Sequence, residues 1–314
     1  MKIGVFFGGK NPEHDISIIT GNLILNGLRK IGRDACAVYL DKEGKWRLGD
    51  ELDSVAFFKK PEGMDRLGRW YLDLEKSRGM MVFKKKGWGG KTVAIDLAFP
   101  AFHGQNGEDG TMQGLFEILG IPYVGCGVAS SAIAMDKVLT KLFYEQAGFP
   151  TAKFIYFGRR DWERKKADFM NKIRTGLSSS LFVKPARLGS SIGIAKVGNE
   201  KDLSFAIDVA FKYDEKVIVE EGIENVMDVT CAVIGTKAPI PSLLQECIFS
   251  DGFFSYEDKY LTGGGAQLGR ATANFEIPAR LDGTMTSAVQ NLATQVFAKF
   301  ECSGIARVDF LCDM

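Results

Sequence analysis

Apolar and polar positions alternate in blocks at the start of the chain. Residues 2–7 form an apolar run that ends at Gly8-Gly9, and the following segment, 15–30, carries apolar residues at helical spacing. A second apolar run comes next, at 36–40. A strand, a glycine turn, a helix and a second strand in this order predict the opening of a parallel α/β sheet.

The remainder of the first 126 residues adds a further strand and a further helix. Residues 41–91 are irregular and rich in lysine and glycine, which predicts hairpins and a surface excursion. The apolar run 96–100 predicts a buried strand, and the segment 110–119 predicts a helix. We therefore expect residues 1–126 to form an N-terminal α/β domain.

The middle of the chain, residues 127–221, has the pattern of a small α+β domain. A long helix is predicted from 130 to 147, and a β-hairpin at 182–197, where glycine and serine separate two apolar runs. The other expected elements are strand 154–157, helix 161–174, helix 203–212 and strand 216–220. A third block, 222–314, has antiparallel character and contains helix 284–300 and strand 305–311.

Composition and charge restrict the function classes. The 314 residues are 46% hydrophobic and 25% charged, and the net charge is +1, as in ordinary globular proteins. We therefore expect neither a nucleic acid nor a membrane as partner, because no strong positive field and no bilayer-length apolar run is present. The six cysteines lack CxxC spacing, which predicts reduced, mostly buried thiols in a cytoplasmic protein. With two histidines in the chain, a histidine-rich zinc site is not expected.

Two polar segments follow predicted strands, at the strand ends where open α/β sheets bind ligands. In segment 8–17, Glu13 could hold an ammonium group or stabilise the start of the next helix, and the residues leave both readings open. In segment 102–111, His103 lies among acids and glycines. This density of polar groups favours a substrate loop over a plain capping loop.

The predicted hairpin at 182–197 carries the strongest chemical signal. Lys184 comes just before a tight loop with the sequence Gly189-Ser190-Ser191. Backbone N–H groups in such a loop can form an anion-binding concavity, and the lysine adds positive charge. The simplest ligand is a nucleoside triphosphate, and Lys137 would contribute to the same site if it lies near Lys184.

Acidic and aromatic residues mark three further segments. Glu220 and Glu221 end an apolar strand and precede Asp228, so they could accept hydrogen bonds from a nucleotide or form an ordinary charged strand end. The aromatic segment 253–260 precedes three glycines, which suits either a mobile flap or a loose edge hairpin.

Arg307 and Asp309 face the same side of a predicted buried strand, because side chains alternate along a strand. An unpaired buried charge is costly, so the two side chains either form a structural ion pair or bind charged groups. The functional reading is a metal-binding aspartate beside an oxyanion-binding arginine.

Together these segments resemble the motifs of the D-alanine–D-alanine ligases, which are members of the ATP-grasp superfamily. The matching segments are GGKNPEHDIS, FHGQNGEDGTMQG, MDK, FVKPARLGSSIG, FFSYEDKY and GIARVDF, in this order. The resemblance implies an α/β fold, with an N-terminal parallel α/β substrate domain at 1–126 and a two-lobed α+β ATP-grasp fold after it. The central lobe would span 127–221, and an incomplete C-terminal lobe, without its last strands, would span 222–314.

The resemblance also implies an activity. ATP would phosphorylate the carboxylate of a first D-alanine, and the amine of a second D-alanine would attack the acyl phosphate to give a dipeptide for peptidoglycan synthesis. The implied cofactors are ATP and Mg²⁺ or Mn²⁺. The implied assembly is a homodimer in the cytoplasm.

Residue roles in nucleotide binding follow from the matched motifs. The resemblance implies that Lys137 and Lys184 bind the ATP phosphates, Glu220 and Glu221 lie along the adenine, and Asp228 contacts the ribose. The loop residues implied to cradle the nucleotide are Gly189, Ser190 and Ser191.

Roles toward the amino-acid substrates follow in the same way. Glu13 would bind the ammonium group of the first D-alanine, and Ser190 and Tyr260 would help to position the substrates. Lys259 would lie in the flap, and His103 would line the substrate pocket. Tyr260 favours D-alanine over D-lactate as the second substrate.

The last matched segment raises a question about the C-terminus. Arg307 would stabilise the tetrahedral oxyanion and Asp309 would bind Mg²⁺, but the family pattern continues beyond Met314 with a Glu-x-Asn metal motif and a substrate loop. Asp309 would then be the only protein ligand of the metal, so this sequence is expected to be a fragment or an impaired ligase. The alternative functions are a D-alanine–D-lactate or D-alanine–D-serine ligase, and a catalytically impaired nucleotide-binding fragment.

Overall fold

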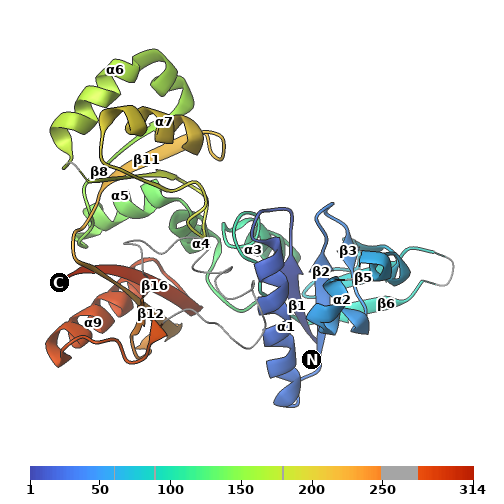
Figure 1. Cartoon of the computed structure of the whole chain (residues 1–314). Helices are drawn as coiled ribbons and strands as arrows, with labels where there is room; N and C mark the ends of the chain where they lie inside the picture. The colour runs from blue at the N-terminus through green and yellow to red at the C-terminus, as the bar shows by residue number, and fades with distance from the viewer. Residues whose placement is uncertain (60, 88–89, 179, 249–274) are drawn as a thin grey trace. The chain divides into compact units, whose positions relative to one another are not determined.

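The computed structural model describes residues 1–59, 61–87, 90–178, 180–248 and 275–314 (Figure 1). These residues form two compact units, each described separately below. The first unit contains residues 1–132 together with 302–305, and the second contains the described residues of 133–301 together with 306–314. No helix in the described part of the chain is both long and apolar enough to cross a membrane.

The first unit is built on a seven-stranded sheet with the strand order β6-β5-β4-β3-β2-β1-β7. Its strands are β1 (Ile3–Gly8), β2 (Ala35–Leu40), β3 (Trp46–Arg47), β4 (Trp70–Leu72), β5 (Met81–Lys85), β6 (Thr92–Ile95) and β7 (Leu97–Pro100). β1 pairs in parallel with both β2 and β7, as the sequence pattern predicts. The pairings from β2 through β6 are antiparallel, so the sheet is mixed rather than parallel throughout.

The helices of the first unit cover both faces of its sheet. They are α1 (His14–Lys30), α2 (Val55–Phe58), α3 (Thr111–Leu119) and the 3₁₀ helices Asp50–Asp53 and Pro61–Leu67. The next helix, α4 (Val128–Met135), contains the boundary between the two units. Alternation along β1 separates the two cores, because Phe6 packs against Phe116 of α3 while Phe7 belongs to the cluster that contains Leu25 of α1.

The segment 41–91 is more than the predicted surface excursion. It does contain hairpin strands, but Trp70, Met81 and Phe83 are buried in the same core as Phe6. The sequence gives little sign of this because the strands are two to five residues long. Strands that short show almost no periodicity.

One predicted helix is interrupted near the start of the second unit. The predicted helix 130–147 is two helices, α4 and α5 (Lys137–Ala147), separated at Asp136. Asp136 has extended backbone angles, and its carboxylate accepts hydrogen bonds from the backbone N–H groups of Val138 and Leu139. Asp136 is therefore an N-cap, the residue type that begins a new helix.

A four-stranded sheet, with the order β10-β9-β11-β8, forms the centre of this part of the chain. Its strands are β8 (Phe154–Gly158), β9 (Leu181–Pro185), β10 (Ala195–Val197) and β11 (Lys216–Glu221), and its other helices are α6 (Arg159–Gly176) and α7 (Glu200–Ala210). The antiparallel pairing of β9 with β10 confirms the predicted hairpin. α6 and α7 lie on one side of the sheet and α5 on the other (Figure 1).

The third block is antiparallel where its pairings are described. Its elements are β12 (Val226–Gly235), β13 (Ile240–Pro241), β14 (Gln245–Cys247), β15 (Phe275–Glu276), α9 (Gly283–Lys299) and β16 (Gly304–Asp313). β12 pairs with β13, β14 and β16, and α9 lies against β12. This agrees with the predicted antiparallel character.

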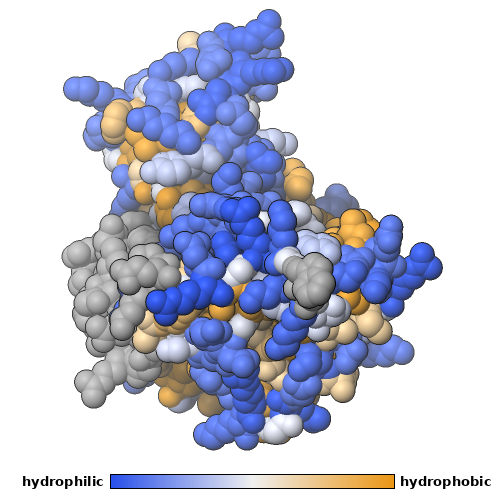
Figure 2. Space-filling view, turned by 90° about the vertical axis from the view of Figure 1, so that its right-hand side faces the viewer, coloured by the Kyte–Doolittle hydropathy of each residue, from blue (hydrophilic) through white to orange (hydrophobic). Residues whose placement is uncertain are grey.

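On the face shown in Figure 2, hydrophilic side chains cover most of the described residues, and apolar side chains form small groups. All six cysteines are free thiols, as predicted. The expectation that most are buried is wrong: Cys231 is buried, and the other five are partly exposed.

Candidate functional site

Glu13 lies where two polar segments of the first unit meet. Because β1 and β7 are parallel neighbours, the segments that follow them leave the same edge of the sheet. Asn11 Nδ2 donates to the backbone oxygen of Gln105 over 2.9 Å. A Cβ atom placed on Gly104 would lie 2.2 Å from Glu13 Oε2, so only glycine leaves room for this carboxylate.

The buried Glu13 precedes α1, yet its side chain makes no capping hydrogen bond to that helix. Glu13 therefore does not cap α1 through a hydrogen bond, although a carboxylate at this position still interacts favourably with the helix dipole. Its carboxylate instead lies against the 102–111 segment. A buried carboxylate between two loops at a strand edge can receive the ammonium group of a small substrate.

Carboxylates within the 102–111 segment fix its backbone by accepting hydrogen bonds from N–H groups of the same segment. Glu108 Oε2 accepts from the N–H of Gly104 over 2.6 Å, and Asp109 accepts from the N–H groups of Asn106 and Thr111. His103 Nε2 lies 2.8 Å from Thr20 Oγ1 of α1, which sets the position of the imidazole. The other histidine, His14, is buried between Gly9 and Tyr39, and its burial lowers the pKa of its imidazole.

In the second unit, the loop between β9 and β10 has an unusual backbone. Ser190 and Ser191 have φ angles of 53° and 59°, and Gly193 has 73°. Two successive non-glycine residues in the left-handed region are strained, and such strain persists where a binding loop needs a fixed shape. Turns of this kind aim backbone N–H groups toward anions.

Lys137 and this loop are neighbours. Lys137 Nζ donates to the backbone oxygen of Leu188 over 2.5 Å, and its own N–H donates to Ala186 over 2.9 Å. The first residue of α5 is thus joined to the loop that follows Lys184. The structure therefore brings together the two lysine-bearing segments, as the sequence hypothesis requires.

Lys184 and Glu220 lie on the same face of the sheet, because Lys184 pairs with Ile218 and Phe182 with Glu220 in the β9–β11 register. Lys184 Nζ is 2.5 Å from Glu220 Oε2. The Glu220 side chain is 8% exposed. Burial by itself would raise the pKa of Glu220, but the neighbouring lysines hold it below its usual value.

A third lysine completes this cluster, and the sequence hypothesis missed it. Lys141 Nζ lies 3.5 Å from Glu220 Oε1, and its side chain is 13% exposed. Burial lowers the pKa of Lys141, although Glu220 opposes the effect. The spacing in the sequence could have identified Lys141. It follows Lys137 by four residues, and residues four apart lie on the same face of a helix.

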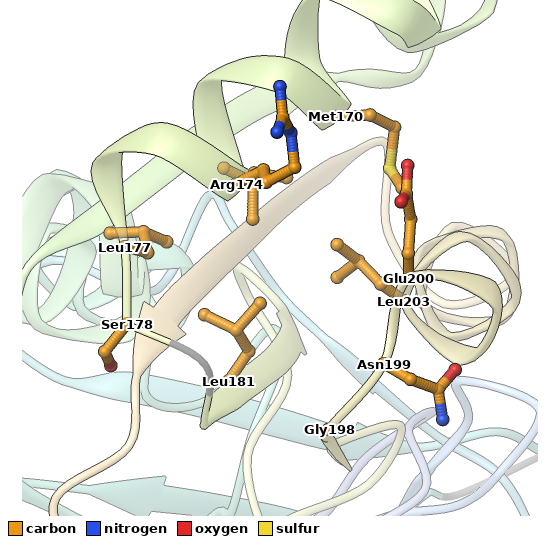
Figure 3. A pocket seen from close by; sticks show the side chains of 10 residues that line it. Met170, Arg174, Leu177, Ser178, Leu181, Gly198, Asn199, Glu200 and Leu203 are labelled. Carbon is orange, nitrogen blue, oxygen red and sulfur yellow. The ribbon is translucent and has the colours of Figure 1, made fainter.

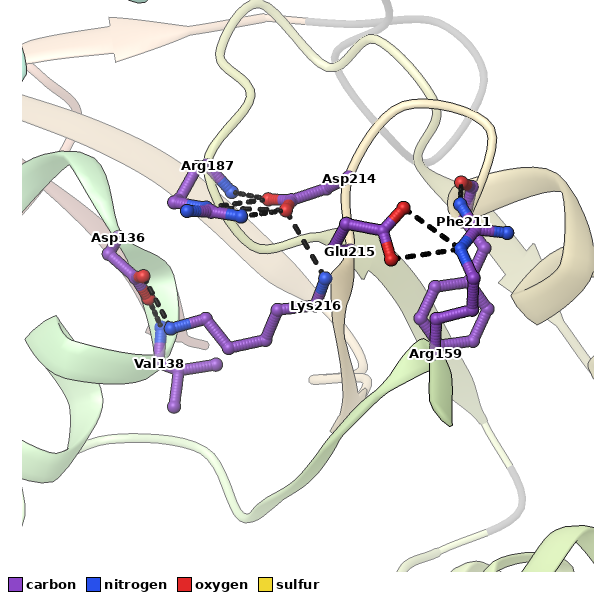
Figure 4. A network of polar contacts seen from close by, with 8 residues as sticks. All are labelled: Asp136, Val138, Arg159, Arg187, Phe211, Asp214, Glu215 and Lys216. Atoms are coloured by element: carbon purple, nitrogen blue, oxygen red, sulfur yellow. Dashed lines mark hydrogen bonds and ion pairs between the residues drawn. The ribbon is translucent and has the colours of Figure 1, made fainter. Parts of the chain in front are cut away.

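A polar network holds the lysine-bearing segments in place (Figure 4). Asp136, which caps α5, accepts from Lys216 Nζ of β11 over 2.5 Å. Asp214 accepts from the backbone N–H of Arg187 over 2.7 Å and from that guanidinium over 2.5 Å. These contacts tie the start of α5 and the β9–β10 loop to the first residue of β11 and the segment just before it.

The other two predicted nucleotide-binding acids are placed differently. Glu221 Oε1 accepts from the N–H of Ser178 over 2.9 Å and lies 3.8 Å from Lys153 Nζ, so this carboxylate supports the local chain. Asp228 is half-buried on β12, where it pairs with Cys247. Glu221 lies on the opposite face of β11 from Glu220, because side chains alternate along a strand.

Arg307 and Asp309 form an ion pair on β16, with Nε to Oδ1 at 2.8 Å and Nη2 to Oδ2 at 2.9 Å. Thr230 Oγ1 also donates to Asp309 Oδ1, over 3.1 Å. The prediction that they lie in a buried strand is wrong, because their side chains are 67% and 53% exposed. Among the described residues, only one side of β16 is covered, so Val308 is buried while these two neighbours face outward.

The chemistry of Asp309 suits a metal bound mainly through a nucleotide. Among the described residues, no group of three or more His, Cys, Asp or Glu side chains could hold a metal ion. Mg²⁺ commonly needs only one or two carboxylates when phosphates and water supply its other ligands. Both oxygens of the exposed Asp309 carboxylate accept hydrogen bonds from Arg307. Asp309 fits the metal-binding role if one of these two hydrogen bonds breaks.

Two predicted residues fall outside the described part of the chain. They are Lys259 and Tyr260 of the segment 253–260.

A separate cavity of about 240 Å³ lies on the other face of the central sheet (Figure 3). It lies between α6 and α7, with Leu177, Leu181 and Leu203 around it and Arg174 at its rim. Val183 of β9 faces the α6–α7 side, whereas Lys184 faces α5. The cavity therefore does not belong to the lysine cluster.

Comparison with known families covers both parts of the chain. The family model described as D-ala D-ala ligase N-terminus matches residues 2–126, and the one described as D-ala D-ala ligase C-terminus matches residues 143–314. Two similar curated proteins are D-alanine–D-alanine ligases. That of Thermosipho africanus is 36% identical over 311 residues, covering 99% of this chain and 82% of the relative. That of Caldicellulosiruptor bescii is 38% identical over 320 residues, covering 100% and 82%.

Two solved ligase structures are similar in fold to this chain over nearly its whole length. The VanG D-Ala:D-Ser ligase from Enterococcus faecalis superposes with a TM-score of 0.80 at 32% identity, covering 99% of this chain and 85% of that one. The D-alanine-D-alanine ligase from Coxiella burnetii superposes with a TM-score of 0.77 at 30% identity, covering 99% and 81%.

Proposed function

The chain belongs to the D-alanine–D-alanine ligase family, and from this premise we propose that it uses ATP to join two D-alanines into D-alanyl-D-alanine for peptidoglycan synthesis. This membership confirms the resemblance and the ATP-grasp fold expected from the motifs. The observation that carries the proposal is that both halves of the family match this chain, at 2–126 and 143–314.

The reaction requires two bond-forming steps. The carboxylate of the first D-alanine attacks the γ-phosphorus of ATP, which forms an acyl phosphate and releases ADP. The amine of the second D-alanine then attacks the acyl carbon, loses a proton and expels inorganic phosphate. Catalysis of phosphoryl transfer depends mainly on positioning and on neutralising charge.

The central-lobe residues suit the first step. In our proposal Lys137 and Lys184 bind the ATP phosphates beside the Gly189–Ser191 loop, while Glu220, Glu221 and Asp228 lie toward the adenosine. The support is the Lys137 contact to the loop at 2.5 Å and the left-handed backbone at Ser190 and Ser191. Both features favour an anionic ligand.

The remaining roles concern the amino acids. We assign Glu13 to the ammonium group of the first D-alanine, with His103 lining its pocket, on the strength of the buried Glu13 carboxylate beside Gly104. Arg307 is assigned to the developing oxyanion because a guanidinium stabilises negative charge there. The roles of Lys259, Tyr260 and Ser190 in positioning substrates rest on the sequence motifs alone.

Metal and assembly are further parts of the proposal. Mg²⁺ or Mn²⁺ would neutralise phosphate charge, and Asp309 would contribute a carboxylate to hold it. A homodimer in the cytoplasm, where ATP is abundant, is proposed from the family resemblance.

The decisive experiment supplies ATP, Mg²⁺ and D-alanine and measures both inorganic phosphate and dipeptide mass. We expect phosphate and D-alanyl-D-alanine in equal amounts. Parallel reactions offer D-serine or D-lactate as the second substrate, and a preference for either would replace the dipeptide assignment. ATP binding without D-alanine-dependent phosphate release would contradict the proposed ligase activity.

A further inference from the structure

Lys141 occupies a fixed position next to Glu220 that does not depend on Lys184. Its ammonium donates to Thr151 Oγ1 over 2.9 Å and to the backbone oxygen of Ala152 over 3.0 Å. It also lies 5.3 Å from the centre of the Phe154 ring. An ammonium group has three donors, so one remains for Glu220 after these two bonds.

More than one lysine acts on the single carboxylate of Glu220. One carboxylate with 8% exposure is approached by Lys184 at 2.5 Å and by Lys141 at 3.5 Å, one lysine to each oxygen. Lys137 of α5 adds a further positive charge that acts on Glu220. Among the described residues, three lysines thus act on this one carboxylate, and such an excess of positive charge attracts an anion.

Binding of phosphate by Lys184 would disturb this balance. A triphosphate draws the Lys184 ammonium away from Glu220, and a buried carboxylate that loses its counter-ion is strongly destabilised. Lys141 can prevent this, because its contacts to Thr151 and Ala152 keep it beside Glu220. Movement of Lys184 also removes a neighbouring positive charge that lowers the pKa of Lys141.

We propose that Lys141 is the stationary counter-ion of Glu220, which allows Lys184 to leave that carboxylate and bind the phosphates of the nucleotide. Lys141 is in this sense a positioning residue, since it acts through Glu220 and Lys184. The inference rests on the proposed phosphate role of Lys184.

The proposal makes a specific prediction about protons. In Lys141→Gln, Glu220 would be left without a counter-ion when Lys184 moves, so its pKa would rise on nucleotide binding and it would take up a proton. A group whose pKa rises on binding makes binding tighter at low pH, by up to about tenfold per pH unit for one proton. In the unsubstituted protein Lys141 stays in place, so Glu220 stays ionised throughout.

The experiment is isothermal titration of the full chain with ATP and Mg²⁺, without D-alanine, at pH 6 and pH 8 in two buffers of different ionisation enthalpy. Relative to the unsubstituted protein, Lys141→Gln should bind at least about tenfold more weakly at pH 8, recover at pH 6, and take up additional protons. Lys141→Arg, which keeps the charge, should restore both affinity and proton balance. Adding Glu220→Gln to Lys141→Gln should abolish the additional proton uptake.

Each outcome has a distinct meaning. Unchanged proton uptake in a folded Lys141→Gln protein, checked by circular dichroism, would overturn the counter-ion role. If that variant does not fold, Lys141→Arg with proton uptake different from the unsubstituted protein would overturn it instead. Lys184→Ala separates the two proposals, because unchanged ATP affinity there would remove the phosphate role of Lys184 itself.

Discussion

Asp136 offers the sharpest test of how the fold positions the lysines. Its carboxylate caps α5 through the N–H groups of Val138 and Leu139, at 3.0 and 3.2 Å, and also receives Lys216 Nζ at 2.5 Å. The Asp136 side chain is 7% exposed and that of Lys216 26%. Asp136→Ala removes the cap and the ion pair together, whereas Asp136→Asn removes the charge and keeps a good capping group.

The expected magnitudes follow from these contacts. Loss of an N-cap costs about 1 kcal/mol, and leaving the partly buried Lys216 without its partner costs roughly a further 1–2 kcal/mol, less than for a fully buried pair. We therefore expect Asp136→Ala to lower the local stability of α5 by about 2–3 kcal/mol and Asp136→Asn by about 1–2 kcal/mol.

Native-state hydrogen exchange measured by mass spectrometry reports this locally. Peptides from α5 should exchange about 30- to 150-fold faster in Asp136→Ala, because each 1.4 kcal/mol is a factor of ten. Peptides from α3, in the other unit, are the internal reference. Equal acceleration in the Ala and Asn variants would refute a stabilising cap, and no acceleration in either would refute the whole account of Asp136.

Two further predictions concern Asp214 and Gly104. Hydrogen bonds from Arg187 hold the pKa of Asp214 below 3.8 against the opposing effect of burial, so its contribution to stability is present above that pH and is lost as the pH falls through the lowered value. Asp214→Asn should lower the free energy of unfolding by about 1–3 kcal/mol at pH 7. Urea denaturation at several pH values should also show a smaller loss of stability toward acid pH in this variant. An unchanged loss toward acid pH would contradict the stabilising role of the Asp214 carboxylate. Gly104 has a φ of +73°, and a Cβ atom there would lie 2.2 Å from Glu13 Oε2. Gly104→Ala should therefore displace the Glu13 carboxylate and raise the KM for D-alanine. The control is Gly114→Ala, where nothing lies within 4 Å, and equal KM values for both variants would argue against Glu13 as the ammonium site.

Local patterns in the sequence were sufficient for most elements of the fold. The apolar run of β1, the periodicity of α1 and the Gly-Ser hairpin of β9 and β10 each depend on residues close together in the chain. A strand or a helix reports its buried face through a period of 2 or 3.6 residues, which can be read without knowing any partner. The order of the polar motifs identified the family for the same reason.

Contacts between residues far apart in the sequence were visible only in the tertiary structure. The 130–147 segment has a continuous apolar pattern, and the break at Asp136 is stabilised partly by Lys216, which lies 80 residues away. Residues 41–91 joined the core only because each short strand found a neighbour in the sheet. Exposure of Arg307 and Asp309 likewise depends on which side of β16 is covered.

The Lys141–Glu220–Lys184 cluster shows most clearly which properties follow from the sequence and which follow from the tertiary structure. The amino-acid sequence determined that each side chain is charged and which face of its helix or strand it occupies. The register of β9 against β11, and the packing of α5 on that sheet, decided that two lysines meet one carboxylate in a nearly dry environment. Electrostatic effects depend on distance and burial, and neither quantity is a property of the sequence pattern alone.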